Sequence, residues 1–197
     1  LGSGWIYDKF HCSHLEVAKY SPLSASGKVK IPRKIKRMTS VLNIESKDNK
    51  CFLYCLIAGK LNLVNQLPKD PKRYTKYLDK LDSIKMGPVS FPVKIKDILK
   101  IEDLNGLSIS VFQWCIEDNC VLPLKHGCGT GKQVDLLYIE DEHTAHYLLI
   151  KDFSAFMRHR TKYHHSMHYC RKCLHGFTDK RKQEYHSEKC KQGINQC

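Results

Sequence analysis

The pattern of hydrophobic and polar positions predicts helices in the first half of the chain. Residues 41–44, Val-Leu-Asn-Ile, alternate like a short strand. The apolar run of residues 51–59 is long enough for a helix of about three turns. Helical spacing returns over residues 71–84, where a proline opens the pattern, and over residues 93–104, where apolar positions recur among charges.

The second half changes to the period of strands. Residues 107–114, 121–124, 134–140 and 146–151 are rich in branched and aromatic side chains and are bounded by polar segments. A polar turn at 141–144 joins the last two of these strands. Helices followed by an antiparallel meander predict an α+β fold.

A group of cysteines and a histidine near the C-terminus has the spacing of a metal site. Cys170 and Cys173 are separated by two residues, and after twelve intervening residues come His186 and Cys190, separated by three. Positions i and i+4 share one face of a helix, so the last two can point at one ion. Tetrahedral Zn²⁺ takes thiolate and imidazole ligands of this kind. We therefore predict a structural Zn²⁺ in a ββα finger, with Phe177 as its core aromatic.

A second candidate site is centred on Cys51, where a polar segment enters the apolar helix. Unpaired N–H groups and the helix dipole at that position stabilise a thiolate and lower the thiol pKa. His146, at the mouth of a core strand far downstream, is the best candidate base, because papain-type peptidases have this Cys-then-His order. The Cys51 backbone N–H and the Asn49 side chain are candidate oxyanion donors. Taken singly, each residue also fits a buried core position, and only the pair favours catalysis.

The group that orients the imidazole is left open by the sequence. Asp152 follows His146 by six residues. On a straight strand that separation takes the carboxylate out of reach, so the chain has to bend between them. The other candidates are Glu140, Asp135 and a separate Asp141–His143 pair.

Several segments together resemble the region ahead of the protein-primed family B DNA polymerase of Maverick/Polinton-type transposons. The resemblance extends over nearly the whole chain and is carried by Asn49–Phe52, Phe91–Ile98, His146-Tyr147, Ile150–Asp152 and the finger. Within it, Asp48–Phe52 and His146-Tyr147 also resemble the cysteine and histidine boxes of papain-fold deubiquitinases, of the ovarian-tumour or herpesvirus-tegument kinds.

This resemblance implies a papain-like cysteine peptidase fold and a thiol hydrolase. The implied substrate is ubiquitin or a ubiquitin-like modifier, or a polyprotein encoded by the element. The chain departs from both deubiquitinase patterns at the acid. Ovarian-tumour enzymes carry it two residues after the histidine, which is Leu148 here, and tegument enzymes two residues before it, which is Thr144.

The charge balance adds a second hypothesis. The formal net charge of +13 and a pI near 9.3 favour acidic partners, with nucleic acid first. Basic residues gather at 28–37 and again at 158–191, around the finger. The alternative functions are therefore a nucleic-acid-binding accessory module and a catalytically dead docking scaffold. The finger itself fits nonspecific nucleic-acid binding and a stabilising role equally well.

Composition and these motifs together predict the organisation of the chain. The longest apolar stretches are far shorter than the roughly 20 residues of a membrane span, so we expect no membrane association. Uneven cysteine spacing favours reduced thiols, and hence the cytoplasm or nucleus. The predicted parts are a tag remnant at 1–3, a basic lead-in at 4–39, a cysteine-peptidase-like domain at 40–156, a basic linker at 157–168 and the C2HC finger at 169–192.

Overall fold

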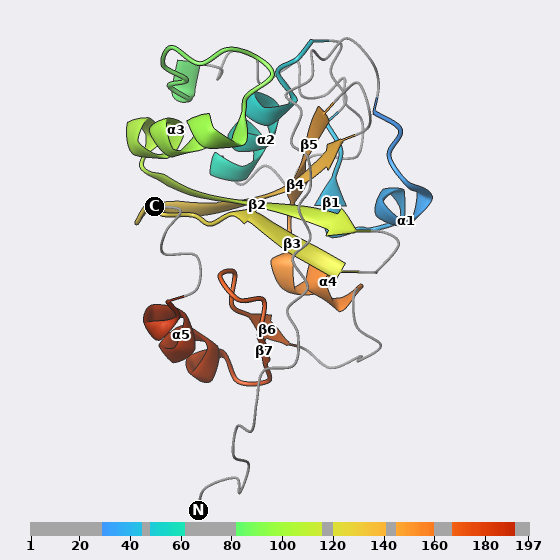
Figure 1. Cartoon of the computed structure of the whole chain (residues 1–197), viewed down its shortest axis with the longest axis vertical. Coiled ribbons are helices and arrows are strands. Elements are labelled where there is room, and N and C mark those ends of the chain that lie inside the picture. The colour runs from blue at the N-terminus through green and yellow to red at the C-terminus, as the bar shows by residue number, and fades with distance from the viewer. Residues whose placement is uncertain are drawn as a thin grey trace, which may run out of the picture.

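The chain folds as a mixed α+β protein built on a five-stranded sheet (Figure 1). The computed structural model describes residues 29–44, 48–61, 82–115, 120–140, 145–159 and 167–191. Most of the helix predicted over 71–84 lies outside these residues. Among the described residues, no helix is both long and apolar enough to cross a bilayer.

The sheet is mixed, which corrects the predicted antiparallel meander. Its strand order is β1-β5-β4-β2-β3, and β2 pairs with β4 in parallel while the other neighbours are antiparallel. The reason is that β3 forms the outer edge, so the returning chain crosses to the far side of β2. The strands are β1 Val41–Leu42, β2 Leu107–Cys115, β3 Cys120–Lys125, β4 Lys132–Glu140 and β5 Ala145–Ile150.

The crossing segment between β3 and β4 depends on glycine. It passes so close to the start of β2 that a Cβ atom at Gly129 would overlap the carbonyl oxygen of Leu107. A Cβ atom at Gly131 would overlap the carbonyl oxygen of Gly106 in the same way. Only glycine lets two backbones approach this closely.

Two helices cover one face of the sheet (Figure 1). These are α2, Cys51–Lys60, and α3, Ile98–Asn105, which follows the short 3₁₀ turn η3, Ile95–Asp97. Most of α2 is buried, as its unbroken apolar run predicts, and Phe52 and Leu56 are fully enclosed. This first core meets the sheet at Tyr147 and Leu149 of β5.

A second core fills the opposite face. It lies against the short helices α1, Arg33–Lys36, and α4, Phe153–Arg158, neither of which the sequence pattern predicted. Ile35 of α1 and Phe156 of α4 are both buried there. Leu148 and Ile150 of β5 also point into this second core, so successive residues of β5 serve alternate cores.

The C-terminal segment folds as the predicted ββα unit. Its elements are β6 His168–Tyr169, β7 Gly176–Phe177 and α5 Lys180–Lys189. Asp179 caps α5 by accepting hydrogen bonds from the backbone N–H groups of Arg181 and Lys182. Tyr169 and Leu174 belong to the second core, so this unit packs on the sheet.

A buried ion pair links α3 to the sheet. Lys125 Nζ lies 2.6 Å from Glu102 Oε2, and both side chains are almost fully buried. The Glu102 carboxylate also accepts from the backbone N–H of Ile109, while Lys125 donates to the carbonyl of His126 at 2.6 Å. Each charge therefore has several partners, as burial of charge requires.

Candidate thiol site and candidate metal centre

Cys51 is the first residue of α2 and only 5% of it is exposed. Asp48 holds the entry to the helix. Its carboxylate accepts from the Lys50 backbone N–H at 3.2 Å and from the Tyr54 hydroxyl at 2.9 Å. Burial, followed by this hydrogen bond to Asp48, raises the pKa of Tyr54 to about 12. The sequence expectation of a cysteine at a helix entrance is therefore met.

The Cys51 sulfur lies against the backbone of β5. Burial raises its pKa above the usual 9.0, and a hydrogen bond with the Tyr147 backbone acts in the opposite direction. A contact that lowers a thiol pKa stabilises the thiolate, so the Tyr147 N–H is the donor. Burial prevails, and the thiol is protonated at neutral pH. This differs from the expected low pKa, because the helix entrance is covered rather than open to water.

A second thiol occupies the next turn of α2. Cys55 is fully buried and donates to the Tyr147 carbonyl oxygen at 3.5 Å. Its pKa is raised well above 9.0, first by burial and then by Cys51. The two cysteines thus contact the peptide groups on either side of Tyr147. The strand segment that carries His146 is thereby fixed against the start of α2.

His146 is held by a residue that the sequence did not single out. Its Nε2 atom lies 2.8 Å from Oδ1 of Asn43, which follows β1. An amide oxygen accepts, so Nε2 is the donor in this contact. The only signal for Asn43 in the sequence was its place in the predicted strand at 41–44. Its partner depends on the β1–β5 pairing, which the sequence does not reveal.

His146 and Tyr147 project to opposite sides of β5. Tyr147 points into the first core, where its ring packs edge-on against Phe52 at 5.1 Å between centroids. Alternation places the His146 side chain on the other side. In the described residues β1 pairs with β5 only at Leu149 and Ile150. His146 therefore lies on the other side of β5 from the first core that holds Cys51, and no contact within the described residues joins these two predicted catalytic residues.

The predicted orienting acids have other partners. Asp152 caps α4, where its side chain accepts from the Ala155 N–H at 2.9 Å, and no described contact joins it to His146. Glu140 accepts from the Tyr138 hydroxyl at 3.0 Å. A capping carboxylate is aimed along its own helix, which accounts for the position of Asp152.

The remaining predicted residues are Asp135, Asn49 and the Asp141–His143 pair. Asp135 forms a two-pronged ion pair with Arg171, at 2.8 and 3.0 Å from Nε and 2.8 Å from Nη2. The Asn49 side chain makes no hydrogen bond within the described part of the chain. The Asp141–His143 pair lies outside the described residues.

The four predicted metal ligands do come together. The ligand atoms of Cys170, Cys173, His186 and Cys190 all lie within 4.8 Å of one another. Cys173 Sγ is 3.1 Å from His186 Nε2. A tetrahedral Zn²⁺ with bonds of about 2.0–2.3 Å spaces its ligands by roughly 3.3–3.8 Å, so the cluster has the right size. These residues can hold a metal ion.

The surroundings of the cluster keep its ligands in place. The Cys170 carbonyl accepts from the Leu174 N–H at 2.8 Å, which closes the turn between the two cysteines. The Phe177 ring packs on the His186 ring at 4.9 Å between centroids, as predicted for the core aromatic.

Comparisons with protein-family models, with characterised proteins and with solved structures found no match for this chain.

Proposed function

We propose that the chain is a thiol-dependent peptidase or isopeptidase of the papain-like kind. Cys51 is the nucleophile, His146 the general base, and Asn43 the residue that orients the imidazole. The observation that carries the proposal is that Cys51 begins α2, while His146, held by Asn43 at 2.8 Å, lies on the strand against which α2 packs. The amide held against His146 at 2.8 Å supplies the third member that Cys-His-Asn peptidases use.

The proposed reaction begins from a neutral thiol, because burial raises the Cys51 pKa. His146 Nδ1 accepts the thiol proton as the sulfur attacks the substrate carbonyl carbon, and the imidazolium then donates this proton to the leaving amine. Water hydrolyses the resulting thioester, with His146 again acting as base. The step requires the imidazole to come within hydrogen-bond reach of the sulfur when substrate binds.

Two groups near Cys51 are suited to the negative oxygen of the intermediate. The Cys51 N–H is at the first turn of α2, where helical N–H groups have no partner within the helix. The Asn49 side chain makes no other described hydrogen bond. Both donors belong to the turn between Asp48 and the start of α2, which Asp48 stabilises through its hydrogen bond from the Lys50 N–H. Donors held in place before substrate binds suit an oxyanion site.

The proposed substrate is ubiquitin or a ubiquitin-like modifier, as the resemblance to deubiquitinases implies. A reduced nucleophile and thiolate metal ligands both require a reducing compartment, so we place the protein in the cytoplasm or nucleus.

For the metal cluster we propose Zn²⁺ in a structural role. Its packing on the sheet through Tyr169 and Leu174 favours stabilisation over a separate binding module.

The test of the peptidase is labelling by ubiquitin and ubiquitin-like probes that end in a propargyl group. We expect wild-type protein to form a covalent adduct with one probe and Cys51→Ala to form none. Cys120→Ala is the matched control, since Cys120 is a half-buried free thiol at the far edge of the sheet. Labelling of Cys51→Ala would reject the nucleophile. Absence of any wild-type adduct, together with no cleavage of ubiquitin-like substrates, would reject the peptidase.

The role of Asn43 has a separate readout. Asn43→Ala is expected to lower kcat by at least tenfold with little change in KM, because the imidazole loses its orientation but the substrate contacts stay. Asn43→Asp keeps an acceptor and should recover part of the activity with an altered pH profile. Equal kcat for wild type and Asn43→Ala would show that the contact is structural only.

A further inference from the structure

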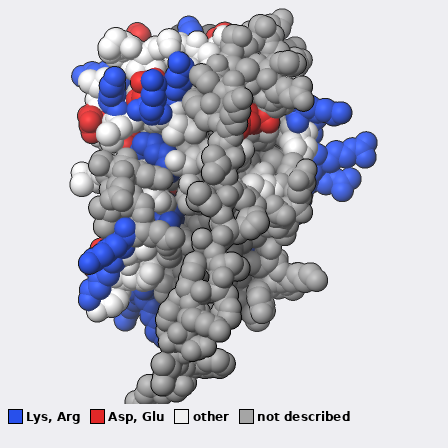
Figure 2. Space-filling model, in the orientation of Figure 1, with Lys and Arg blue, Asp and Glu red and all other residues white. Residues whose placement is uncertain are grey.

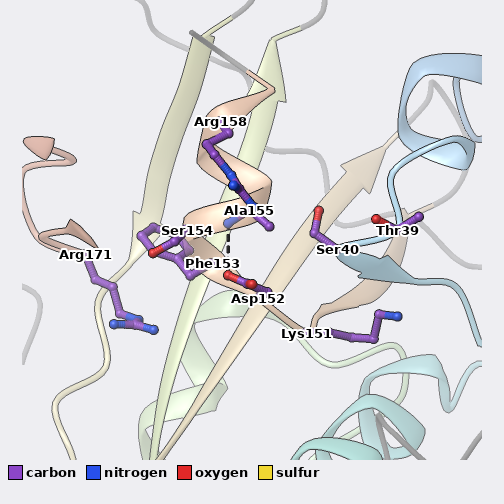
Figure 3. Close-up of a pocket in the computed structure, with 9 residues that line it drawn as sticks. All are labelled: Thr39, Ser40, Lys151, Asp152, Phe153, Ser154, Ala155, Arg158 and Arg171. Atoms are coloured by element: carbon purple, nitrogen blue, oxygen red, sulfur yellow. Dashed lines mark hydrogen bonds between the residues drawn. The ribbon is translucent and has the colours of Figure 1, made fainter. Parts of the chain in front are cut away.

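A pocket of about 670 Å³ opens where the end of β5, the segment before β1, helix α4 and the finger meet. None of its lining residues belongs to the proposed thiol site. Figure 3 shows Thr39, Ser40 and Lys151 on one side of the first turn of α4, with Arg171 on the other. Its walls therefore come from three separate parts of the chain.

The pocket is electropositive. Lys151, Arg158 and Arg171 line it, and the carboxylate of Asp152 is their one acidic neighbour on its walls. Asp152 already accepts from the Ala155 N–H, and Arg171 is neutralised by Asp135. No ion pair joins Lys151 or Arg158 to a carboxylate in the described part of the chain. Two cationic side chains are thus available to a ligand.

Ser40 supplies an unsatisfied polar group at this pocket. Only 4% of Ser40 is exposed, and its hydroxyl has no hydrogen-bond partner among the described residues. Its carbonyl accepts from the Lys151 N–H at 2.7 Å, so the serine and the lysine are fastened together. Buried hydroxyls without a partner are rare in folded proteins. An acceptor oxygen from a ligand would satisfy this one.

Further cations continue from the pocket toward α1. Burial lowers the pKa of His159, and the charges of Lys34 and Arg158 lower it further, which places both cations close to this ring. The α1 sequence, Arg-Lys-Ile-Lys, adds more positive charge. Figure 2 shows Lys and Arg side chains projecting from the surface over α1. The pocket is therefore one end of a cationic strip, not an isolated cation pair.

We propose that this pocket binds a backbone phosphate of a nucleic acid strand. Lys151 and Arg158 neutralise the phosphate, the Ser40 hydroxyl donates to one of its oxygens, and neighbouring phosphates of the same strand lie along α1. A continuous strip suits a polymer with regularly spaced charges better than it suits a single small anion. The site carries no base-reading contact, so binding is independent of sequence.

The experiment measures binding of an end-labelled, mixed-sequence, single-stranded DNA by fluorescence anisotropy across a range of salt concentrations. The double variant Lys151→Gln/Arg158→Gln is compared with Lys100→Gln, an exposed lysine of α3 on the opposite face of the sheet. We expect the double variant to weaken binding at least tenfold and to reduce the salt slope by about 1–2, which corresponds to the loss of one or two phosphate contacts. The control should leave the slope unchanged.

Ser40→Ala separates the specific site from general charge. We expect it to weaken DNA binding several-fold with an unchanged salt slope, while the melting temperature of the free protein stays the same or rises, because an unsatisfied hydroxyl is removed. Circular dichroism on every variant verifies the fold. DNA binding by the double variant that matches the Lys100→Gln control overturns the proposal. So does a result in which only phosphopeptides or phosphoinositide vesicles, assayed in parallel, respond to these substitutions.

Discussion

The ion pair between Arg171 and Asp135 should control how firmly the finger is attached to the sheet. Three N–H···O contacts of 2.8–3.0 Å join the two side chains, and the guanidinium also stacks on the Phe153 ring at 4.8 Å. Asp135 is only 7% exposed, so Arg171→Ala would leave a buried carboxylate without its cation. Such a loss costs about 3–5 kcal/mol for a fully buried pair.

Solvent reduces this figure, because the Arg171 side chain is 37% exposed. We therefore expect Arg171→Ala to lower the free energy of unfolding by about 2–3 kcal/mol and the melting temperature by roughly 5–10 °C. The assay is urea unfolding in buffer that contains Zn²⁺, with Asp135→Ala and the double variant completing a thermodynamic cycle. The expected coupling energy is about 1–2 kcal/mol.

Lys180→Ala is the matched control, since its ion pair with Glu184 at 3.6 Å is exposed on both sides. Its cost should be below about 0.5 kcal/mol. A coupling energy between Arg171 and Asp135 no larger than that of the control would refute the reasoning. The finger would then be held by apolar contacts alone.

Three further outcomes are expected. Burial raises the pKa values of Cys51, Cys55 and Tyr54, so the folded state binds these protons more tightly than the unfolded state. The stability that these protonated groups contribute is complete below pH 9.0 and is lost as the pH rises toward about 12. A melting temperature that stays constant over this pH range would contradict this prediction. Chelation of the bound metal ion should lower the melting temperature of the whole protein in a single transition. Unfolding of the finger alone, with the rest of the protein unchanged, would instead argue that the finger is an independent module. Glu102→Ala should cost about 3–5 kcal/mol in urea unfolding, and Glu102→Ala/Lys125→Met appreciably less, because the double variant leaves no unpaired buried charge.

Hydrophobic periodicity was sufficient to predict most elements and the α+β class. The apolar run from residue 51 forms α2, and the four downstream strands lie where alternation and β-branched content predicted them. The cluster of three cysteines and one histidine was equally predictable, because the spacing of such residues along the chain is set by local turn and helix geometry. These features depend on residues close together in sequence.

The parts that could not be predicted depend on contacts between distant residues. Alternation identifies a strand but not its neighbour, so the parallel β2–β4 pairing was missed. The same limit concealed Asn43, whose contact with His146 exists only because β1 pairs with β5. Asp152 was different. An aspartate just before Phe153-Ser154-Ala155 is a helix-cap pattern, and that local signal was available.

The shared second core has a consequence for any truncation of this chain. A cut after α4 would leave Phe153 and Phe156 without the cover that Tyr169 and Leu174 provide. Exposed aromatic surface of that kind promotes self-association. The Cys/His segment and the sheet thus share one core, and producing either half alone should yield an insoluble product.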